Sequence, residues 1–222
     1  MSTAPSRVVV VGAGGFGIEV AEIVEAASLH GGPRLAGFLD DDESAASRDL
    51  PAPVLGTIGT ADVGPDDGVV IAAGDPQIRH ALRGQFDPSA RWWTVIHPTA
   101  SVSARAMLGP GCVVAPFAYV GPGAQVGAHV ALNIYAGVGH DAVVGNFAVL
   151  SPYATLNGHS VVGEGAFLGT GSVLTVGKRI GEWSKLAAGA IAFGDIASNS
   201  LAAGNPARGR TLYAGPRATR GS

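Results

Sequence analysis

Residues 131 to 168 read ALNIYAGVGHDAVVGNFAVLSPYATLNGHSVVGEGAFL, and every sixth residue of this stretch, starting at Leu132, is aliphatic. The same spacing runs without a gap from Ile96 to Leu186, which makes sixteen consecutive positions. Four residues after each aliphatic position the side chain is nearly always small, and the residue directly after it is usually Gly or Asn. A six-residue period fits neither the 3.6-residue period of a helix nor the two-residue period of a simple hairpin meander.

The six-residue period predicts a coil of short strands. Three strands, each followed by a corner, close one triangular turn, and successive turns stack as in other solenoid repeats. The aliphatic side chain of each step points into the prism, and the small one fits the crowded corner. Cys112 occupies one of the small positions, so we expect it to serve packing. Sixteen steps correspond to about five turns.

A different pattern precedes the repeat. Short apolar runs alternate with helical patterns, as in a small parallel α/β unit with four strands. The runs are at residues 7–11, 35–39, 69–73 and 93–96, and the helical patterns follow residue 17 and cover residues 76–86. The sequence therefore divides into an α/β domain at 1–95, a repeat domain at 96–207 and a C-terminal tail at 208–222.

A glycine-rich turn joins the first predicted strand to the first predicted helix. It reads Gly12-Ala13-Gly14-Gly15-Phe16-Gly17, and Asp40 follows at the end of the next strand. Glycines at this place let the backbone approach phosphate groups at the helix N-terminus. A nucleotide-linked sugar, an NAD-type dinucleotide and a purely structural glycine turn all fit the motif. The small size of the unit, with no dehydrogenase domain after it, favours the nucleotide-linked sugar.

Composition narrows the classes of partner and the compartment. The formal charge of −3 and the pI near 6.0 give no basic surface, which argues against nucleic acid. No apolar run reaches the roughly 18 residues of a membrane span, and the apolar run at residues 8–11 is too short for a signal peptide. A single cysteine fits a reducing compartment. We therefore expect a cytoplasmic protein without a membrane partner.

The repeat resembles the hexapeptide signature of the left-handed β-helix acyltransferases. From residue 7 to about residue 208 the chain resembles their sugar acetyltransferases, which carry a small nucleotide-binding unit ahead of the helix. The landmarks are Gly12 to Gly17, Leu39-Asp40-Asp41, Gly74-Asp75 with Arg79, Ile96-His97-Pro98, Asn133, Gly139-His140-Asp141 and Gly204-Asn205-Pro206-Ala207. The resemblance implies acetyl-CoA as co-substrate and a homotrimer with active sites between neighbouring helices.

His140 is the predicted general base. It lies two residues past the inward-pointing Val138, at a corner where a side chain can project outward. Acyl transfer needs a base with a pKa near neutrality, and the adjacent Asp141 can orient an imidazole. The resemblance assigns this role to Gly139-His140-Asp141 and puts Asn133 near the reaction centre.

The resemblance also implies the residues that bind the two substrates. Gly14, Gly15 and Phe16 would contact the nucleotide, Asp40 and Asp41 would face its base or ribose, and Gly74 with Arg79 would complete the site. The backbone at Gly158, Thr170 and Ala188 would hold acetyl-CoA. Relatives carry histidine where Phe16 and Val149 stand here.

Three functions remain open. The predicted function is acetyl-CoA-dependent N-acetylation of an amino group on a nucleotide-linked sugar, with O-acetylation of a sialic-acid-type hydroxyl as the alternative. A non-catalytic protein that binds a nucleotide-linked sugar is an alternative of another class. A metal site is not expected, because the spacings between His129, His140 and His159 do not match the length of a turn, so the three histidines do not fall at matching places on successive turns.

Overall fold

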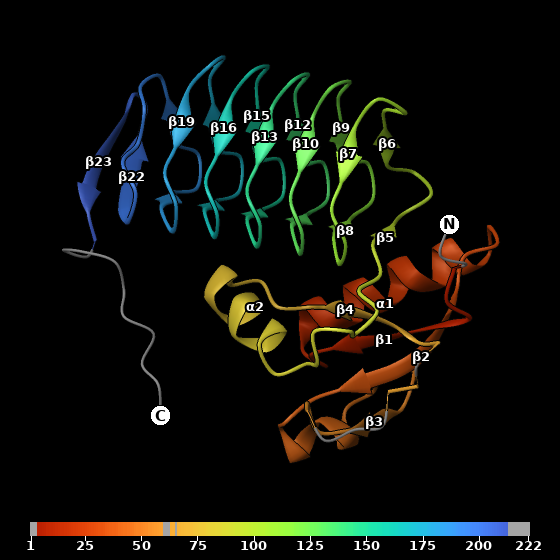
Figure 1. Ribbon diagram of the computed structural model, residues 1–222. Coiled ribbons are helices and arrows are strands. Elements are labelled where there is room, and N and C mark those ends of the chain that lie inside the picture. The colour runs from red at the N-terminus through yellow and green to blue at the C-terminus, as the bar shows by residue number, and fades with distance from the viewer. Residues whose placement is uncertain (1–3, 60–62, 65, 213–222) are drawn as a thin grey trace.

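The computed structural model describes residues 4–59, 63–64 and 66–212, and these form an α/β unit and a long prism of short strands (Figure 1). The strands of the α/β unit are parallel and lie in the order β3-β2-β1-β4. Its elements in chain order are β1 (Arg7–Val11), α1 (Gly15–Ser28), β2 (Arg34–Leu39), the 3₁₀ helix η1 (Glu43–Ser47), β3 (Val54–Gly56), β4 (Gly68–Ile71) and α2 (Pro76–Arg83). This arrangement confirms the predicted parallel α/β unit.

Buried apolar runs form the sheet, as the sequence predicts. Residues 8–11 of β1 are all buried, because β1 lies between β2 and β4 and is covered on both faces. α1 buries Val20, Ala21 and Val24 in one cluster with Val8 and Val10 of β1. Each such side chain that leaves water contributes about 1.5–3 kcal/mol to folding.

The sheet has four strands, as predicted, but one of them is β3 and not the predicted strand at residues 93–96. The prediction that residues 93–96 belong to this sheet is therefore wrong. β3 is three residues long and lies among prolines, and its apolar run is too short to stand out in the sequence. Residues 95–96 instead form β5 and pair with β8, which lies one turn later in the prism. They already follow the six-residue period, so their hydrogen-bond partners lie in the prism. Trp92 keeps one parallel bridge to Val69.

The prism is a left-handed parallel β-helix whose strands are two residues long. Each strand from β5 to β18 pairs in parallel with the third strand after it, which confirms the predicted triangular turn. We call the three sheets the first face (β5, β8, β11, β14, β17, β20), the second face (β6, β9, β12, β15, β18, β21) and the third face (β7, β10, β13, β16, β19). The strands are β5 (Val95–Ile96), β6 (Ser101–Val102), β7 (Met107–Leu108), β8 (Val113–Val114), β9 (Tyr119–Val120), β10 (Gln125–Val126), β11 (Ala131–Leu132), β12 (Gly137–Val138), β13 (Val143–Val144), β14 (Val149–Leu150), β15 (Thr155–Leu156), β16 (Val161–Val162), β17 (Phe167–Leu168), β18 (Val173–Leu174), β19 (Arg179–Ile180), β20 (Lys185–Leu186) and β21 (Ile191–Ala192).

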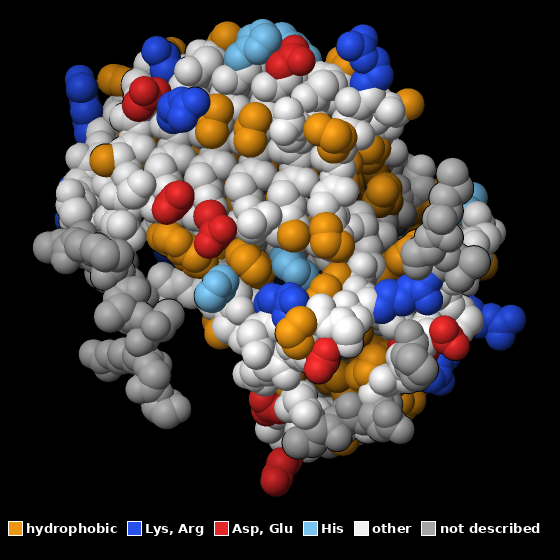
Figure 2. All heavy atoms as spheres, in the orientation of Figure 1, with side chains coloured by type: hydrophobic (Ala, Val, Ile, Leu, Met, Phe, Trp, Pro, Cys, Tyr) orange, Lys and Arg blue, Asp and Glu red, His pale blue; other side chains and the backbone are white. Residues whose placement is uncertain are grey.

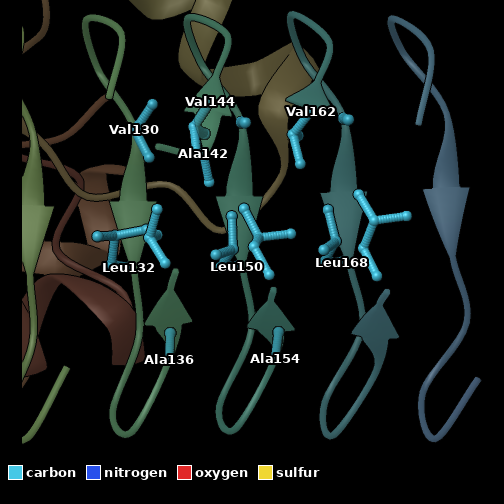
Figure 3. Close-up of a cluster of buried hydrophobic side chains, with 14 of the residues drawn as sticks. Val130, Leu132, Ala136, Ala142, Val144, Leu150, Ala154, Val162 and Leu168 are labelled. Atoms are coloured by element: carbon cyan, nitrogen blue, oxygen red, sulfur yellow. The ribbon is translucent and has the colours of Figure 1, made fainter. Parts of the chain in front are cut away.

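The interior of the prism is a ladder of aliphatic side chains. Leu132, Leu150 and Leu168 stack on successive turns, and small residues such as Ala136 and Ala154 fill the corners (Figure 3). Cys112 is buried in the same core, as predicted, and burial raises the pKa of its thiol to about 11. The thiol donates to the carbonyl of Gly127 at 3.1 Å, so it is a packing residue and not a reactive one.

The prism ends in an antiparallel hairpin. β22 (Ser200–Gly204) pairs with β20, and β23 (Ala207–Thr211) pairs with β22. Residues 208–211 belong to β23, so the predicted start of the tail at residue 208 is wrong. β23 pairs with the edge of β22 that would otherwise be open. Residues 213–222, with Arg217 and Arg220, lie outside the described residues.

The α/β unit packs against the first face of the prism (Figure 1). The outward side chains of Val113, Ala131 and Val149 are buried in one cluster with those of α1 and β1. Across residues 4–59, 63–64 and 66–212, no helix combines the length and hydropathy that crossing a bilayer requires.

We call the packed interface between the α/β unit and the prism the joint. His129 lies in this joint, at the corner between the third and first faces. The residue is 3% exposed, and its ring stacks on that of Phe147 and meets that of Trp92 edge-on, with centroids 5.1 and 4.6 Å away. Burial, followed by the charges of Arg79 and Arg83, lowers the pKa of His129 to about 4. The folded state therefore holds this imidazole neutral at physiological pH.

We expect the free energy of unfolding to fall as the pH is lowered from about 6.5 to 4. In this window the unfolded chain binds a proton at His129 that the folded chain does not, and the full difference is roughly 3 kcal/mol. Urea unfolding at fixed protein concentration and at pH 7, 6 and 5 measures the slope. The variant His129→Phe keeps a stacking ring without a titrating group, so its slope should be shallower. Equal slopes for the two proteins would contradict the prediction.

Candidate active site

The predicted base lies on the corner between the second and third faces. Residues 139–142 form the turn between β12 and β13, and Asp141 adopts a left-handed backbone conformation with φ of +55°. Because the flanking strands point their aliphatic residues inward, the turn side chains project outward. His140 Nδ1 lies 2.9 Å from Asp141 Oδ2, and the side chains are 57% and 53% exposed. Figure 2 shows histidine and acidic side chains gathered on the ridge of the prism farthest from the α/β unit.

Glycines on the neighbouring turns leave room for this pair. A Cβ at Gly158, one turn after His140, would overlap the imidazole ring. A Cβ at Gly123, one turn before Asp141, would overlap its carboxylate. The ring of His159 stands edge-on to that of His140, with the centroids 4.9 Å apart. Gly158 and Gly123 therefore leave room for the imidazole and the carboxylate, and His159 is the neighbouring side chain that contacts the pair.

The electrostatics of the corner favour an ionised Asp141. The hydrogen bond from His140, followed by the charges of His159, His140 and Arg105, lowers the pKa of this carboxyl group. An ionised carboxylate accepts the Nδ1–H of the imidazole and leaves the lone pair on Nε2. His140 can therefore take a proton from a substrate through Nε2.

The same corner has the spacing of a metal site. His140, Asp141 and His159 each bring one ligand atom within 4.8 Å of the others. The sequence spacing predicts that His159 and His140 do not lie at matching places on successive turns. The structure still brings their rings together, because His159 is only one residue past position 158, which lies one turn after His140. His129, which the sequence analysis considered with these histidines, is buried in the joint at another corner.

Asn133 does not join His140 and Asp141 within one chain. It begins the turn between β11 and β12, at the corner between the first and second faces, and its Nδ2 donates to the carbonyl of Leu150 at 3.1 Å. Its predicted place near the reaction centre stays a prediction.

The glycine-rich turn opens the N-terminus of α1. Gly14 is the N-cap residue and no side chain caps the helix, so the first amides are open. A Cβ at Gly14 or Gly15 would meet nothing within 4 Å, whereas a Cβ at Gly17 would overlap the carbonyl of Gly12. Phe16 is half-buried and packs against the α/β core. An uncapped helix N-terminus with accessible amides suits an anion such as a diphosphate.

Asp40 and Asp41 organise the loops around this turn. Asp40 accepts from the amide of Ala13 at 2.7 Å and, through its other oxygen, from the amide of Asp42 at 2.9 Å. Asp41 accepts from the amide of Ile58 at 2.8 Å. Each carboxylate keeps lone pairs that a ligand could use. The predicted contact of Asp40 and Asp41 with the base or ribose stays a prediction.

Arg48 is a residue of this site that sequence reasoning missed. Its guanidinium donates to the carbonyl of Ala13 at 3.2 Å and pairs with Asp42. It follows η1 in an irregular, polar segment, and no motif in the sequence singles it out.

Gly74 and Arg79 follow β4 but have different surroundings. Gly74 is exposed, and a Cβ there would meet nothing within 4 Å. Arg79 is fully buried, and its guanidinium donates to the carbonyls of Ile71, Ala73 and His129. The structure therefore puts Arg79 in the joint and leaves Gly74 at the open edge of the sheet.

The residues predicted to hold acetyl-CoA lie on two corners. Gly158 is in the turn at residues 157–160, on the same corner as His140. Thr170 and Ala188 occupy equivalent positions on successive turns of the corner between the first and second faces, where the carbonyl of Thr170 accepts from the amide of Gly189 at 2.8 Å. Their contacts with acetyl-CoA stay predictions.

Comparison with known proteins supplies relatives for both parts of the chain. Residues 7–85 match the family described as the PglD N-terminal domain. The acetyltransferase domain of PglB from Neisseria gonorrhoeae FA1090 is 32% identical with a TM-score of 0.84, and the match covers 91% of this chain and 98% of that one. The same domain in complex with acetyl coenzyme A gives a TM-score of 0.85 at 32% identity, covering 92% and 99% of the two chains. PerB from Caulobacter crescentus, in complex with CoA and GDP-perosamine, is 29% identical with a TM-score of 0.82 and covers 95% and 100%. A search of curated protein sequences finds no match.

Proposed function

The chain belongs to the sugar acetyltransferases of the left-handed β-helix type, and we propose that it transfers acetyl from acetyl-CoA to the amino group of a nucleotide-linked sugar. His140 is the general base of this reaction and Asp141 orients it. The observation that carries the proposal is the 2.9 Å contact between these two side chains at an outward corner of the β-helix.

The proposed chemistry needs no covalent enzyme intermediate. The sugar amine attacks the thioester carbon, and a C–N bond forms while His140 Nε2 takes a proton from the attacking nitrogen. The tetrahedral intermediate then collapses, the C–S bond breaks, and the thiolate of CoA leaves and is protonated. Asp141 stabilises the imidazolium that forms on the way. Acetyl-CoA is a co-substrate in this scheme, and no metal ion is required.

Two lines of support favour an amino sugar linked to a nucleotide. The open amides of α1 at Gly14 and Gly15 suit the diphosphate of such a substrate. A relative at 29% identity, covering 95% of this chain, is described as a perosamine N-acetyltransferase in complex with CoA and GDP-perosamine. This likeness favours an amine acceptor over the hydroxyl of the alternative.

The proposed active site lies between copies of the chain in a homotrimer. The α/β unit packs on the first face, whereas His140 is on the corner between the other two faces. A sugar held by α1 of one chain therefore approaches the His140 corner of another copy. Phe117, Tyr135 and Tyr153 support packing between copies, because they stack into an exposed aromatic ladder at the corner between the first and second faces. The proposed compartment is the cytoplasm, since one buried cysteine needs no oxidising environment.

The test is release of CoA thiol from acetyl-CoA in the presence of candidate acceptors. The panel contains uridine, thymidine and guanosine diphosphate forms of amino sugars, with free sialic acid as a hydroxyl acceptor. We expect turnover with at least one amino sugar. Turnover with the hydroxyl acceptor alone would support O-acetylation instead. Calorimetric binding of the nucleotide sugar without any response to acetyl-CoA would support a non-catalytic binding protein.

A further inference from the structure

The joint between the α/β unit and the prism contains a buried cation. Arg79 of α2 is fully buried. Its Nε donates to the carbonyl of His129 in the prism at 2.8 Å, and its Nη1 donates to the carbonyls of Ile71 at 2.9 Å and Ala73 at 3.0 Å. Within the described part of the chain, no carboxylate forms an ion pair with this guanidinium.

Burial of this charge carries a free-energy cost. An ionised group without a counter-charge is unfavourable in the interior, and hydrogen bonds to carbonyls offset only part of the desolvation cost. Burial lowers the pKa of Arg79 to about 10, so the group stays charged at neutral pH. An apolar side chain would fill the same space without this cost. The side chain is therefore best explained by the directed hydrogen bonds that it makes.

These hydrogen bonds connect the base of the glycine-rich turn to the β-helix. The carbonyls of Ile71 and Ala73 flank Ala72, whose amide donates to the carbonyl of Val11 at 2.8 Å. The carbonyl of Ala72 also lies 3.1 Å from the position of a Cβ at Gly12. A shift of residues 71–73 would therefore shift the glycine-rich turn. In the prism, the carbonyl that accepts from Arg79 Nε is that of His129, which lies in the turn that precedes β11.

The other contacts of α2 with the prism are less directed. His80 meets the rings of Phe147 and Trp183 edge-on, with centroids 5.0 and 5.6 Å away. Lys185 Nζ lies 3.7 Å from Asp75 Oδ2 at the exposed end of the helix, where an ion pair contributes little. These contacts hold α2 near the prism, but a ring contact tolerates sliding. The three hydrogen bonds of Arg79 define one orientation.

We propose that Arg79 is a positioning residue that fixes the nucleotide site in one orientation relative to the β-helix. This inference rests on the proposed function, because the orientation matters for delivery of the sugar amine to the His140 corner of a neighbouring copy. Arg79 acts here through the backbone of residues 71–73 and does not touch the substrate. A displacement of about 1 Å at the reacting atoms can cost about 100-fold in rate.

The test compares Arg79→Lys and Arg79→Met with Ile78→Ala, a control at an exposed position of the same helix. We expect kcat to fall by about 10- to 100-fold in Arg79→Met, with the nucleoside diphosphate Kd and the acetyl-CoA KM each within about threefold of the native values. Arg79→Lys should recover part of kcat, because its ammonium can still donate to some of the carbonyls. The control should match the native protein.

Tryptophan emission provides a readout that does not depend on catalysis. Trp92 meets His129 and Trp183 meets His80, so a loosened joint should shift the emission of both to the red. If Arg79→Met fails to fold, Arg79→Lys carries the same measurements. An unchanged kcat would overturn the proposal, and so would a nucleotide Kd that rises in step with the lost activity, since that indicates direct substrate contact. If the native protein acetylates no acceptor, the proposed function fails, and unchanged emission in both variants would separately overturn the role in the joint.

Discussion

His140→Ala is expected to lower kcat by about 10²- to 10⁴-fold, the usual contribution of a general base. The imidazole is held by Asp141 at 2.9 Å and presents Nε2 on the outer ridge of the β-helix. Because the side chain is 57% exposed and supports no core packing, its removal should leave the fold unchanged. The measurement is steady-state release of CoA thiol with the best acceptor of the panel, together with the KM of each substrate.

Two variants make this result specific. His30→Ala removes an exposed histidine at the end of α1 and should leave kcat unchanged. Asp141→Asn keeps the shape of the side chain but cannot stabilise an imidazolium, so its kcat should lie between those of the native protein and His140→Ala. A His140→Ala protein that retains most of the native kcat would rule out the proposed base and leave the enzyme class standing.

Gly14→Asp is expected to weaken nucleotide-sugar binding by about 100-fold or more. A carboxylate at the N-cap would stand beside the diphosphate, and two like charges about 4 Å apart repel by several kcal/mol near a protein surface. The same carboxylate caps a helix that now has no side-chain cap, so the protein should be as stable as the native one or more stable by up to about 1 kcal/mol. Calorimetry and thermal unfolding measure the two effects, which have opposite signs.

Gly14→Asn is the matched control for this charge. Its amide has the size of the carboxylate and can also cap the helix, but it does not repel a phosphate. A Cβ at this position meets nothing within 4 Å, so both variants should fold alike. If Gly14→Asp and Gly14→Asn bind the nucleotide sugar with equal affinity, a negative charge at the helix N-terminus does not affect binding, and the predicted diphosphate site is wrong.

Co-expression of His140→Ala with Gly14→Asp tests whether the active site lies between copies of the chain. A mixed trimer of His140→Ala and Gly14→Asp chains pairs an intact α/β unit from one chain with an intact base from the other. Co-expression should therefore recover activity that neither variant has alone. Mixed trimers without activity would contradict an active site shared between neighbours.

Much of the fold is predictable from the sequence because the β-helix is a local repeat. Every strand pairs with the strand one turn away, so the period of Leu132, Leu150 and Leu168 fixes the partner, the register and the inward side chain together. The pair at residues 140–141 is predictable for the same reason, since adjacent residues at a corner project outward side by side. The glycine-rich turn is a local motif that begins a helix, and it is found where the pattern predicts.

Tertiary structure alone decided how the two parts meet. β3 becomes the fourth strand of the sheet and residues 95–96 pass to the prism, because strand pairing depends on partners far away in sequence. The sequence marks Arg79 as part of a substrate motif, whereas the fold buries it against the carbonyl of His129, 50 residues away. Neither the pKa of about 4 for His129 nor the packing of the α/β unit on the first face can be read from a local pattern. Periodicity specifies contacts at a constant sequence separation, and burial at a joint depends on surfaces that come together only when the chain has folded.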